Sequence, residues 1–531
     1  MPPPHADKFT GMRALALLLA SALATAACGS TAQTQTQTQA QSAARGGALQ
    51  SAADGAAVDG LGGTTSAVGN GSDGTTPGGA GGAGVGITSS APRAAGGGPA
   101  AGALPGPGAA AATPGTATGG FVAGPGVTAT TIALGIPYCN DCAQASAALG
   151  FGSDDPGDTR RYFQAALDDV NARGGVLGRK LVPVFHQVSV KDNFDTSMQA
   201  ACETFTKDHK VAAIFSRGEI IFDCAKKAGI IAVGSGATGA LFQRYPNVFS
   251  PGSIRLERLG AVTVQAMVKQ GWLKPESAWP TGKIGIVTWD TNDYHYAIDK
   301  GWLPALRTAG LKATDIRYIT PPQSDSSVAD ASAAMSSAVL SFRQKGIDHV
   351  FLADGPAGII ASGGITTLFV AGAESQKYYP RYGFNPSNTP EDASAQLPAD
   401  QMAGMLAITA TDATKANDAG MAVNSQRERC FQLMRTKGLT ASEGKATALY
   451  ALAACETAWF SEAVLKRATR GTSVSSVIAA AESLGTAYRS PTSFGTKIGP
   501  NQHDGLYFFR NGRFDSSCSC FKYTSTAYEP K

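Results

Sequence analysis

The chain has 531 residues, a formal net charge of +4 and 64 glycines. This length allows two or three domains, each with its own core. The near balance of charge, with no stripe of Lys and Arg interleaved with aromatic residues, argues against a nucleic-acid partner.

Residues 1–28 have the pattern of an export signal. Two basic residues precede the apolar run from Ala14 to Ala27, which is shorter than the about 20 residues that span a bilayer. The small residues before Cys28 resemble a bacterial lipoprotein signal, although Thr25 replaces the usual branched aliphatic residue. We predict a diacylated Cys28 that anchors the chain to the outer face of the bacterial cytoplasmic membrane. A simple secretory signal is the alternative.

Residues 29–125 are predicted to form a disordered linker. The segment consists mainly of Ala, Gly, Ser, Thr, Gln and Pro, so it has too little apolar bulk to offset its ordering entropy. A flexible coil of this kind would act as a tether between the membrane and the folded part. Its reach would be roughly 50 to 60 Å.

The rest of the chain alternates short apolar, β-branched runs with longer helical patterns. In the predicted helix Thr159–Arg173, apolar residues recur at i, i+3, i+4 and i+7. Such alternation predicts an α/β fold with parallel sheets, and two lobes fit the usual domain sizes better than one large sheet. The strand candidates are Thr131–Ile136, Leu181–Phe185, Val211–Phe215, Ile230–Val233, Ile284–Thr288, Asp315–Ile319, His349–Ala353 and Met405–Thr409.

The spacing Gly234-x-Gly236-x-x-Gly239 directly after an apolar strand matches a dinucleotide-binding fingerprint. That motif requires its third glycine to open a full helix, but Pro246 leaves room for only a short one. We therefore expect no nucleotide cofactor, and no other cofactor. The strand instead leads into small residues with exposed backbone N–H groups, which favour an anionic ligand.

The cysteines support export. The chain has nine, and lipidation of Cys28 would leave an even set. Disulfides are favoured in an oxidising compartment, and a zinc site formed by the first two and the last two cysteines of this set is the alternative. The set comprises Cys139, Cys142, Cys202, Cys224, Cys430, Cys455, Cys518 and Cys520.

Several segments resemble the type I periplasmic binding proteins, the leucine/isoleucine/valine-binding family of ABC-transporter substrate-binding proteins. The segment Gly229–Thr238 is similar to the family's ligand loop, and Asn171–Lys180 to its turn into the second strand. Lys283–Val287, followed by Asp290 and Tyr294, is similar to the opening of the second lobe. The sequences Asp504–Tyr507 and Asn511–Phe514 fit the closing strands.

This resemblance implies two Rossmann-like lobes, with parallel sheets flanked by helices, joined by three hinge crossings. The first lobe would comprise residues 126–250 and 410–495, and the second residues 251–409 and 496–531. The crossings are expected near Phe249–Ser253, Ile408–Thr411 and Pro491–Ile498.

The resemblance also implies the function. A monomer without enzymatic activity would enclose a small solute between its lobes and deliver it to an ABC permease and ATPase. An exported hydrolase is disfavoured, because the sequence has neither a GxSxG elbow nor an HExxH pair. A sensor module of the same fold, not coupled to transport, is a second alternative.

Ligand contacts are carried over from the family position by position. Gly236 would bind through its backbone and Thr238 through its hydroxyl, Tyr294 would reach in from the second lobe, and Arg217 would end a neighbouring strand. Asp354 could replace a missing ammonium clamp, because Gly355 and Asn385 stand where amino-acid-binding members have an aromatic residue and an acid. The departure points to a ligand without an α-amino group and leaves amides, carboxylates and aromatic acids open. The expected class as a whole is a small polar or carboxylate-bearing solute: an amino acid, an amide or an organic acid. The candidate ligand-binding residues are Ser216, Arg217, Ser235, Gly236, Ala237, Thr238, Tyr294, Asp354 and Asn385.

Pairings of the cysteines follow from their expected helices and from the family's bridges. Cys202 and Cys224 would join neighbouring helices of the first lobe, and Cys430 and Cys455 would link two consecutive helices. A local bridge in the loop Tyr138–Cys142 would shape one wall of the ligand site.

Overall fold

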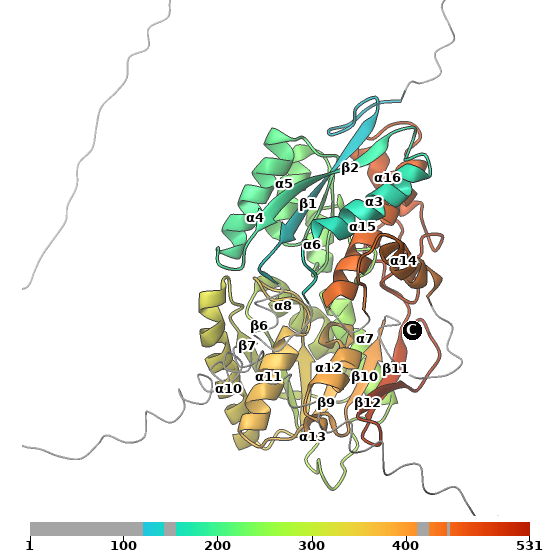
Figure 1. Ribbon diagram of the computed structural model, residues 1–531. Helices are drawn as coiled ribbons and strands as arrows, with labels where there is room; N and C mark the ends of the chain where they lie inside the picture. Colours follow the sequence, from blue (N-terminus) through green and yellow to red (C-terminus); the bar gives the residue numbers. More distant parts are fainter. Residues whose placement is uncertain (1–120, 143–154, 411–423, 443–445, 531) are drawn as a thin grey trace, which may run out of the picture. The chain divides into compact units, whose positions relative to one another are not determined.

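The computed structural model describes residues 121–142, 155–410, 424–442 and 446–530. The predicted signal, Cys28 and the linker up to residue 120 lie outside these ranges. Two separate β-sheets flanked by helices confirm the predicted fold class (Figure 1). No helix in the described ranges combines the length and the apolar character needed to cross a bilayer.

The first sheet has the strand order β2-β1-β3-β4-β5, and all neighbouring strands are parallel. Its strands are β1 (Thr131–Cys139), β2 (Lys180–Val188), β3 (Ala213–Phe215), β4 (Ile231–Val233) and β5 (Val248–Phe249). Its helices are α3 (Arg160–Ala172), α4 (Phe194–Glu203), η1 (Thr204–Asp208), α5 (Glu219–Ala228), α6 (Gly239–Arg244), α14 (Ser425–Thr436), α15 (Ala446–Arg467) and α16 (Val474–Glu482). We call this sheet with its helices the first lobe.

Alternating side chains of the first sheet enter two different cores. Leu134 and Ile231 pack with α3, α14, α15 and α16, whereas Ile214 and Ala232 pack with α4 and α5. This follows from the two-residue period of a strand, which sends successive side chains to opposite faces. The sheet is therefore buried on both sides, as parallel sheets require.

Helix α3 buries the apolar residues whose spacing predicted it, and it ends shortly before two glycines. Its apolar residues at i, i+3, i+4 and i+7 are all buried, and Gly174 and Gly175 follow it with φ of 98° and 68°. A side chain at Gly175 would place its Cβ 2.1 Å from the carbonyl oxygen of Arg179. The turn into β2 therefore requires glycine at this position.

The second sheet has the order β12-β11-β10-β9-β8-β6-β7. It is parallel from β7 to β10, and β11 and β12 are added antiparallel. Its strands are β6 (Ile284–Trp289), β7 (Ala313–Ile319), β8 (His349–Ala353), β9 (Arg381–Phe384), β10 (Leu406–Thr409), β11 (Arg510–Asp515) and β12 (Cys520–Tyr523). Its helices are α7 (Leu256–Lys269), α8 (Asn292–Ala297), η2 (Ile298–Trp302), α9 (Leu303–Thr308), η3 (Asp325–Ser327), α10 (Val328–Gln344), α11 (Gly364–Ser375), η4 (Pro386–Asn388), α12 (Pro390–Gln396) and α13 (Ala399–Met402). We call this sheet with its helices the second lobe.

The segments that connect the lobes are hydrogen-bonded to one another. The N–H of Ser250 donates to the carbonyl of His503 at 2.8 Å, and the N–H of Gly505 donates back to Ser250 at 2.9 Å. The N–H of Phe494 donates to the carbonyl of Ala410 at 2.8 Å. The three crossings thus form one joint, although the part of the second crossing in residues 411–423 lies outside the described ranges.

The folded body begins slightly before the predicted end of the linker. Val122 forms a parallel bridge with Gly471, and the guanidinium of Arg179 lies 4.3 Å from the centre of the Phe121 ring. These contacts fix the first described residues to the first lobe. The exact lobe boundaries stay predictions.

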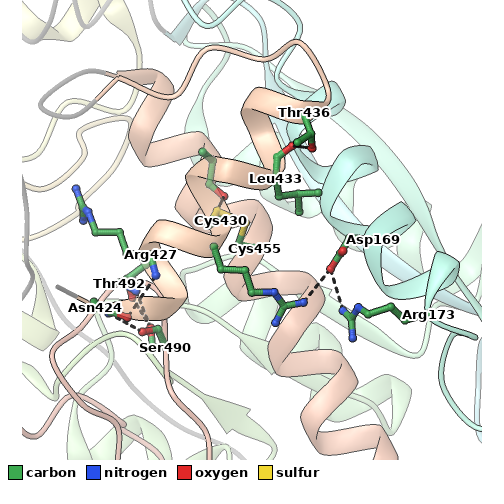
Figure 2. Close-up of a disulfide and its surroundings, with 12 residues drawn as sticks. Asp169, Arg173, Asn424, Arg427, Cys430, Leu433, Thr436, Cys455, Ser490 and Thr492 are labelled. Atoms are coloured by element: carbon green, nitrogen blue, oxygen red, sulfur yellow. Dashed lines mark hydrogen bonds and ion pairs between the residues drawn. A yellow bond between two sulfur atoms is a disulfide. The ribbon is translucent and has the colours of Figure 1, made fainter.

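Disulfides join the eight candidate cysteines in four pairs. The predicted pairs Cys202–Cys224 and Cys430–Cys455 are present, as are the local pairs Cys139–Cys142 and Cys518–Cys520. Figure 2 shows Cys430–Cys455 between α14 and α15, near the ion pair of Asp169 with Arg173. The zinc alternative is wrong for this structure, because each pair is closed on itself and the two pairs lie in different lobes.

Candidate functional site

The candidate ligand residues lie at the carboxyl ends of strands in both sheets. Ser216 and Arg217 follow β3, and the segment 235–238 follows the adjacent strand β4. In the second lobe, Asp354 follows β8 and Asn385 follows β9. Ligands of open α/β sheets bind beyond this edge of the strands, so the positions are consistent with a binding site.

Contacts between the lobes bring the two groups of residues together. The hydroxyl of Thr238 donates to a carboxylate oxygen of Asp293 at 3.3 Å. Gly236 has φ of 77°, and a Cβ there would lie 3.4 Å from the Cγ of Pro356. The segment after β4 therefore faces the second lobe.

Thr238 has two roles in this contact. Its side-chain oxygen accepts a hydrogen bond from the N–H of Leu241 at 3.2 Å, which caps the start of α6. The same hydroxyl is 1% exposed and donates across the lobes to Asp293. Helix capping alone thus does not account for all of its bonds.

The backbone N–H groups around β4 and α6 are partly occupied. The N–H of Gly234 donates to the carbonyl of Phe249, and the N–H of Gly239 donates to both carboxylate oxygens of Glu257 at 3.0 and 3.2 Å. The amides of residues 235–238 make no hydrogen bond to any described residue. The donors open to a ligand are therefore restricted to this short segment.

Arg217 is a half-buried cation at the lobe contact. One of its terminal nitrogens donates to the carbonyls of Gly358 and Ile360 in the second lobe, at 3.0 and 3.2 Å, and its guanidinium lies 5.0 Å from the centre of the Phe194 ring. Burial lowers the pKa of Arg217 to about 10, so the side chain stays charged at neutral pH. No carboxylate of the described residues lies within ion-pair distance of it.

Tyr294 is buried beside Arg217 and Asp293. Its hydroxyl donates to the carbonyl of Pro356 at 3.3 Å, and burial raises its pKa well above the ordinary value. A Cβ at Gly355 would lie 2.3 Å from the same hydroxyl. A side chain at position 355 would therefore displace the Tyr294 hydroxyl, which occupies the space of its Cβ.

Asp354 and Asn385 support the loops of the second lobe. The Asp354 carboxylate accepts hydrogen bonds from the N–H of Gly355 at 2.7 Å and from the N–H and hydroxyl of Thr366 at 3.0 and 2.9 Å. Burial raises the pKa of Asp354 to about 7. Asn385 donates to the carbonyl of Leu352 at 3.2 Å and accepts from the N–H of Ser387 at 2.8 Å. A ligand contact for either side chain stays a prediction.

Two acids at the site were not singled out from the sequence. Asp293 is half-buried in the first turn of α8, burial raises its pKa to about 6, and it has no cation within ion-pair distance among the described residues. Glu257, in the first turn of α7, holds the start of α6. Asp290, the acid on which the resemblance to the second lobe of the family rests, instead pairs with His295 at 2.8 Å. The position of Asp293 directly before Tyr294 was the available signal.

Ser216 and Ser235 are half-buried and lie near the lobe contact. The Ser216 hydroxyl lies 3.6 Å from the sulfur of Met198 in its own lobe. No side-chain hydrogen bond joins Ser235 to a described residue, and Ala237 accepts the N–H of Leu256 through its carbonyl at 3.1 Å. These positions stay candidates.

Comparisons with known proteins agree on one family. The model of the family "Periplasmic binding protein" matches residues 151–509. A search of curated proteins found no match.

Solved structures share the fold at low sequence identity. A fatty acid ABC transporter substrate-binding protein from Thermomonospora curvata has a TM-score of 0.54 at 19% identity, covering 78% of this chain and 96% of its own. A solute-binding protein of an ABC transporter from Rhodopseudomonas palustris BisB5, in complex with 3,4-dihydroxybenzoic acid, has a TM-score of 0.53 at 14% identity, covering 75% and 97%. A possible leucine/isoleucine/valine-binding protein from Rhodopirellula baltica SH 1 has a TM-score of 0.52 at 14% identity, with the same coverage.

Proposed function

The chain belongs to the periplasmic binding protein family, and from this premise we propose that it captures a small carboxylate-bearing solute between its two lobes and delivers it to an ABC importer. Family membership makes it a solute-binding component of an ABC transporter that works outside the cytoplasm. The identity of the solute class is our inference from the residues at the lobe contact.

Arg217 carries the proposal. A half-buried guanidinium without an acidic partner among the described residues is costly unless a ligand supplies the opposite charge. A planar guanidinium can bind both oxygens of a carboxylate, and the amides of residues 235–238 can donate further hydrogen bonds to it. The first lobe would therefore hold the acidic end of the solute.

Asp293 favours a donor at the other end of the solute. Its carboxylate is half-buried and accepts one hydrogen bond, from Thr238 at 3.3 Å. An ammonium or hydroxyl group of the solute would satisfy its remaining acceptor sites. Amino acids and hydroxy acids carry both groups, whereas an amide without a charge would leave Arg217 unpaired.

A thermal-shift screen tests the proposal, because a solute that binds only the folded form raises the melting temperature. The panel should contain amino acids, fatty acids, hydroxybenzoates and their amides. We expect a shift with an acid, and a weaker one in the Thr238→Ala and Tyr294→Ala variants. Ser473→Ala removes a cap of α16 far from the site and serves as the matched control.

The outcome of the screen separates two errors. If acids shift the melting temperature but Thr238→Ala and Tyr294→Ala respond as Ser473→Ala does, the site assignment is wrong and the function stands. If only uncharged solutes bind, the proposed solute class is wrong.

We also propose that diacylated Cys28 anchors the protein to the membrane. The signal-like sequence before Cys28 supports this proposal. Replacement of Cys28 by Ser should release the protein into the soluble extracytoplasmic fraction, and labelled fatty acid should no longer be incorporated. Retention of the label in the variant would contradict the proposal.

A further inference from the structure

The hairpin of β11 and β12 carries an accessible disulfide at its tip. Cys518 and Cys520 are separated only by Ser519, and Cys518 is exposed while Cys520 is half-buried. Each of the other three bridges contains at least one buried cysteine. Among the disulfides of the described residues, this one is the most open to an external thiol.

The tip of the hairpin is a tight turn. Ser519, between the two cysteines, has φ of 47°, in the left-handed region that side-chain-bearing residues rarely adopt. Asp515 pairs with Cys520 across the hairpin, so the strands as well as the disulfide enclose this residue.

A surface hollow of about 340 Å³ lies beside this tip. It is bounded by the ends of β9, β10 and β11 and by the first residue of the turn, and its wall includes Asp515 and Ser516. The sulfur of Cys518 lies 3.6 Å from the carbonyl oxygen of Asp515. A molecule in the hollow would therefore lie against Asp515 and Ser516, at the start of the turn that carries the disulfide.

The charges around the hollow leave an excess positive charge. Arg381 pairs with Glu276 at 3.0 Å, and Asp515 pairs with Lys522 at 2.6 Å. Arg513 is exposed, lines the hollow and forms no ion pair with a described residue. The hollow therefore favours a small anion over a neutral molecule or a cation.

We propose that Cys518–Cys520 is a thiol–disulfide exchange site for small anionic thiols that enter this hollow. The thiolate of the incoming molecule attacks the exposed sulfur of Cys518. A new S–S bond forms, the Cys518–Cys520 bond breaks, and Cys520 leaves as a thiolate that takes a proton from water. A second thiol then attacks the mixed disulfide, so that two small thiols become one oxidised disulfide and the protein keeps two thiols.

The test uses the folded full-length protein and two reductants, thioglycolate as the anionic thiol and 2-mercaptoethanol as the neutral one. Samples are quenched with iodoacetamide, and the alkylated cysteines are identified by peptide mapping. We expect Cys518 and Cys520 to be labelled before any other bridged cysteine, and the mixed disulfide to be found on Cys518. Earlier labelling of another bridge would overturn the proposal.

Variants of Arg513 test the role of the hollow. Both reductants attack as thiolates, and thioglycolate carries an additional carboxylate. A unit charge about 4 Å away contributes about 1 kcal/mol in water, so Arg513→Gln should slow thioglycolate about fivefold more than it slows 2-mercaptoethanol. Arg513→Lys should restore the ratio of the two rates, and Arg307→Gln, which removes an exposed charge from α9, should change neither rate. Equal slowing of both thiols by Arg513→Gln would refute anion selection by the hollow.

Discussion

Replacement of Arg217 by Gln is the most direct test of charge recognition at the lobe contact. Gln keeps a polar side chain of similar length but loses the charge. In the structure, Arg217 donates to the carbonyls of Gly358 and Ile360 and has no acidic partner among the described residues. The substitution should therefore weaken both the contact between the lobes and the binding of an acid.

The expected size of the effect follows from the surroundings of the guanidinium. At 4 Å and an effective dielectric constant of about 20, a guanidinium and a carboxylate attract each other by about 4 kcal/mol. Because Arg217 is only half-buried, solvent screening reduces this value, and we take about 2 kcal/mol. An acidic solute should lose about 30-fold more affinity than its own amide.

Isothermal titration calorimetry with an acid and its amide separates the two effects. Weaker contact between the lobes lowers both affinities, whereas loss of the charge lowers only the affinity for the acid. Arg217→Lys keeps the charge and should retain part of the preference for the acid. An equal loss for acid and amide in Arg217→Gln would refute the reasoning and leave Arg217 as a structural contact.

Other predictions concern titration and stability. Because burial raises the pKa of Asp293 to about 6, affinity for an ammonium-bearing solute should fall from pH 7 to pH 5, and less so in Asp293→Asn; calorimetry at both pH values checks this. Burial also raises the pKa of the Glu456 carboxyl in α15, so the folded protein binds this proton more tightly than the unfolded chain does. The stability that this difference contributes is complete below the unfolded pKa of about 4.3 and is lost as the pH rises through the raised pKa of the folded protein. In urea unfolding, the free energy of unfolding of Glu456→Gln relative to the wild type should therefore increase with pH. A difference that does not change with pH would contradict this prediction. Replacement of both Cys430 and Cys455 by Ala opens a loop with a sequence separation of 25 and should lower the free energy of unfolding by about 3.5 kcal/mol. Urea unfolding measures this loss, and an unchanged midpoint would contradict the prediction.

Most of the strands and the fold class were accessible from the sequence. A strand buried on both faces needs a continuous apolar run, and such runs marked β1, β6 and β8 close to their observed bounds. Strand β9, with the sequence RYGF, was not recognised because it is short and begins with Arg381. Arg381 is tolerated there because its side chain donates to the carbonyls of Gly404 and Trp272.

The candidate site was only partly accessible. The glycines and hydroxyls after β4 indicated a ligand loop, because small residues at the end of a strand leave backbone donors exposed. The family resemblance supplied the expectation of a second lobe opposite that loop. No sequence pattern indicated that Asp354 would be held by Thr366, or that the hydroxyl of Tyr294 would occupy the space beside Gly355.

The sequence by itself determined most of the segments that become strands and helices, because periodicity and glycine positions act over a few residues. Only the tertiary structure decided which charges meet. Thr238 and Asp293 are 55 positions apart, and Arg217 and Gly358 are 141 apart. Such contacts depend on the strand order and on how the crossings pack, and no local pattern encodes them. For this reason the lack of an acidic partner for Arg217 among the described residues could be recognised only from the tertiary structure.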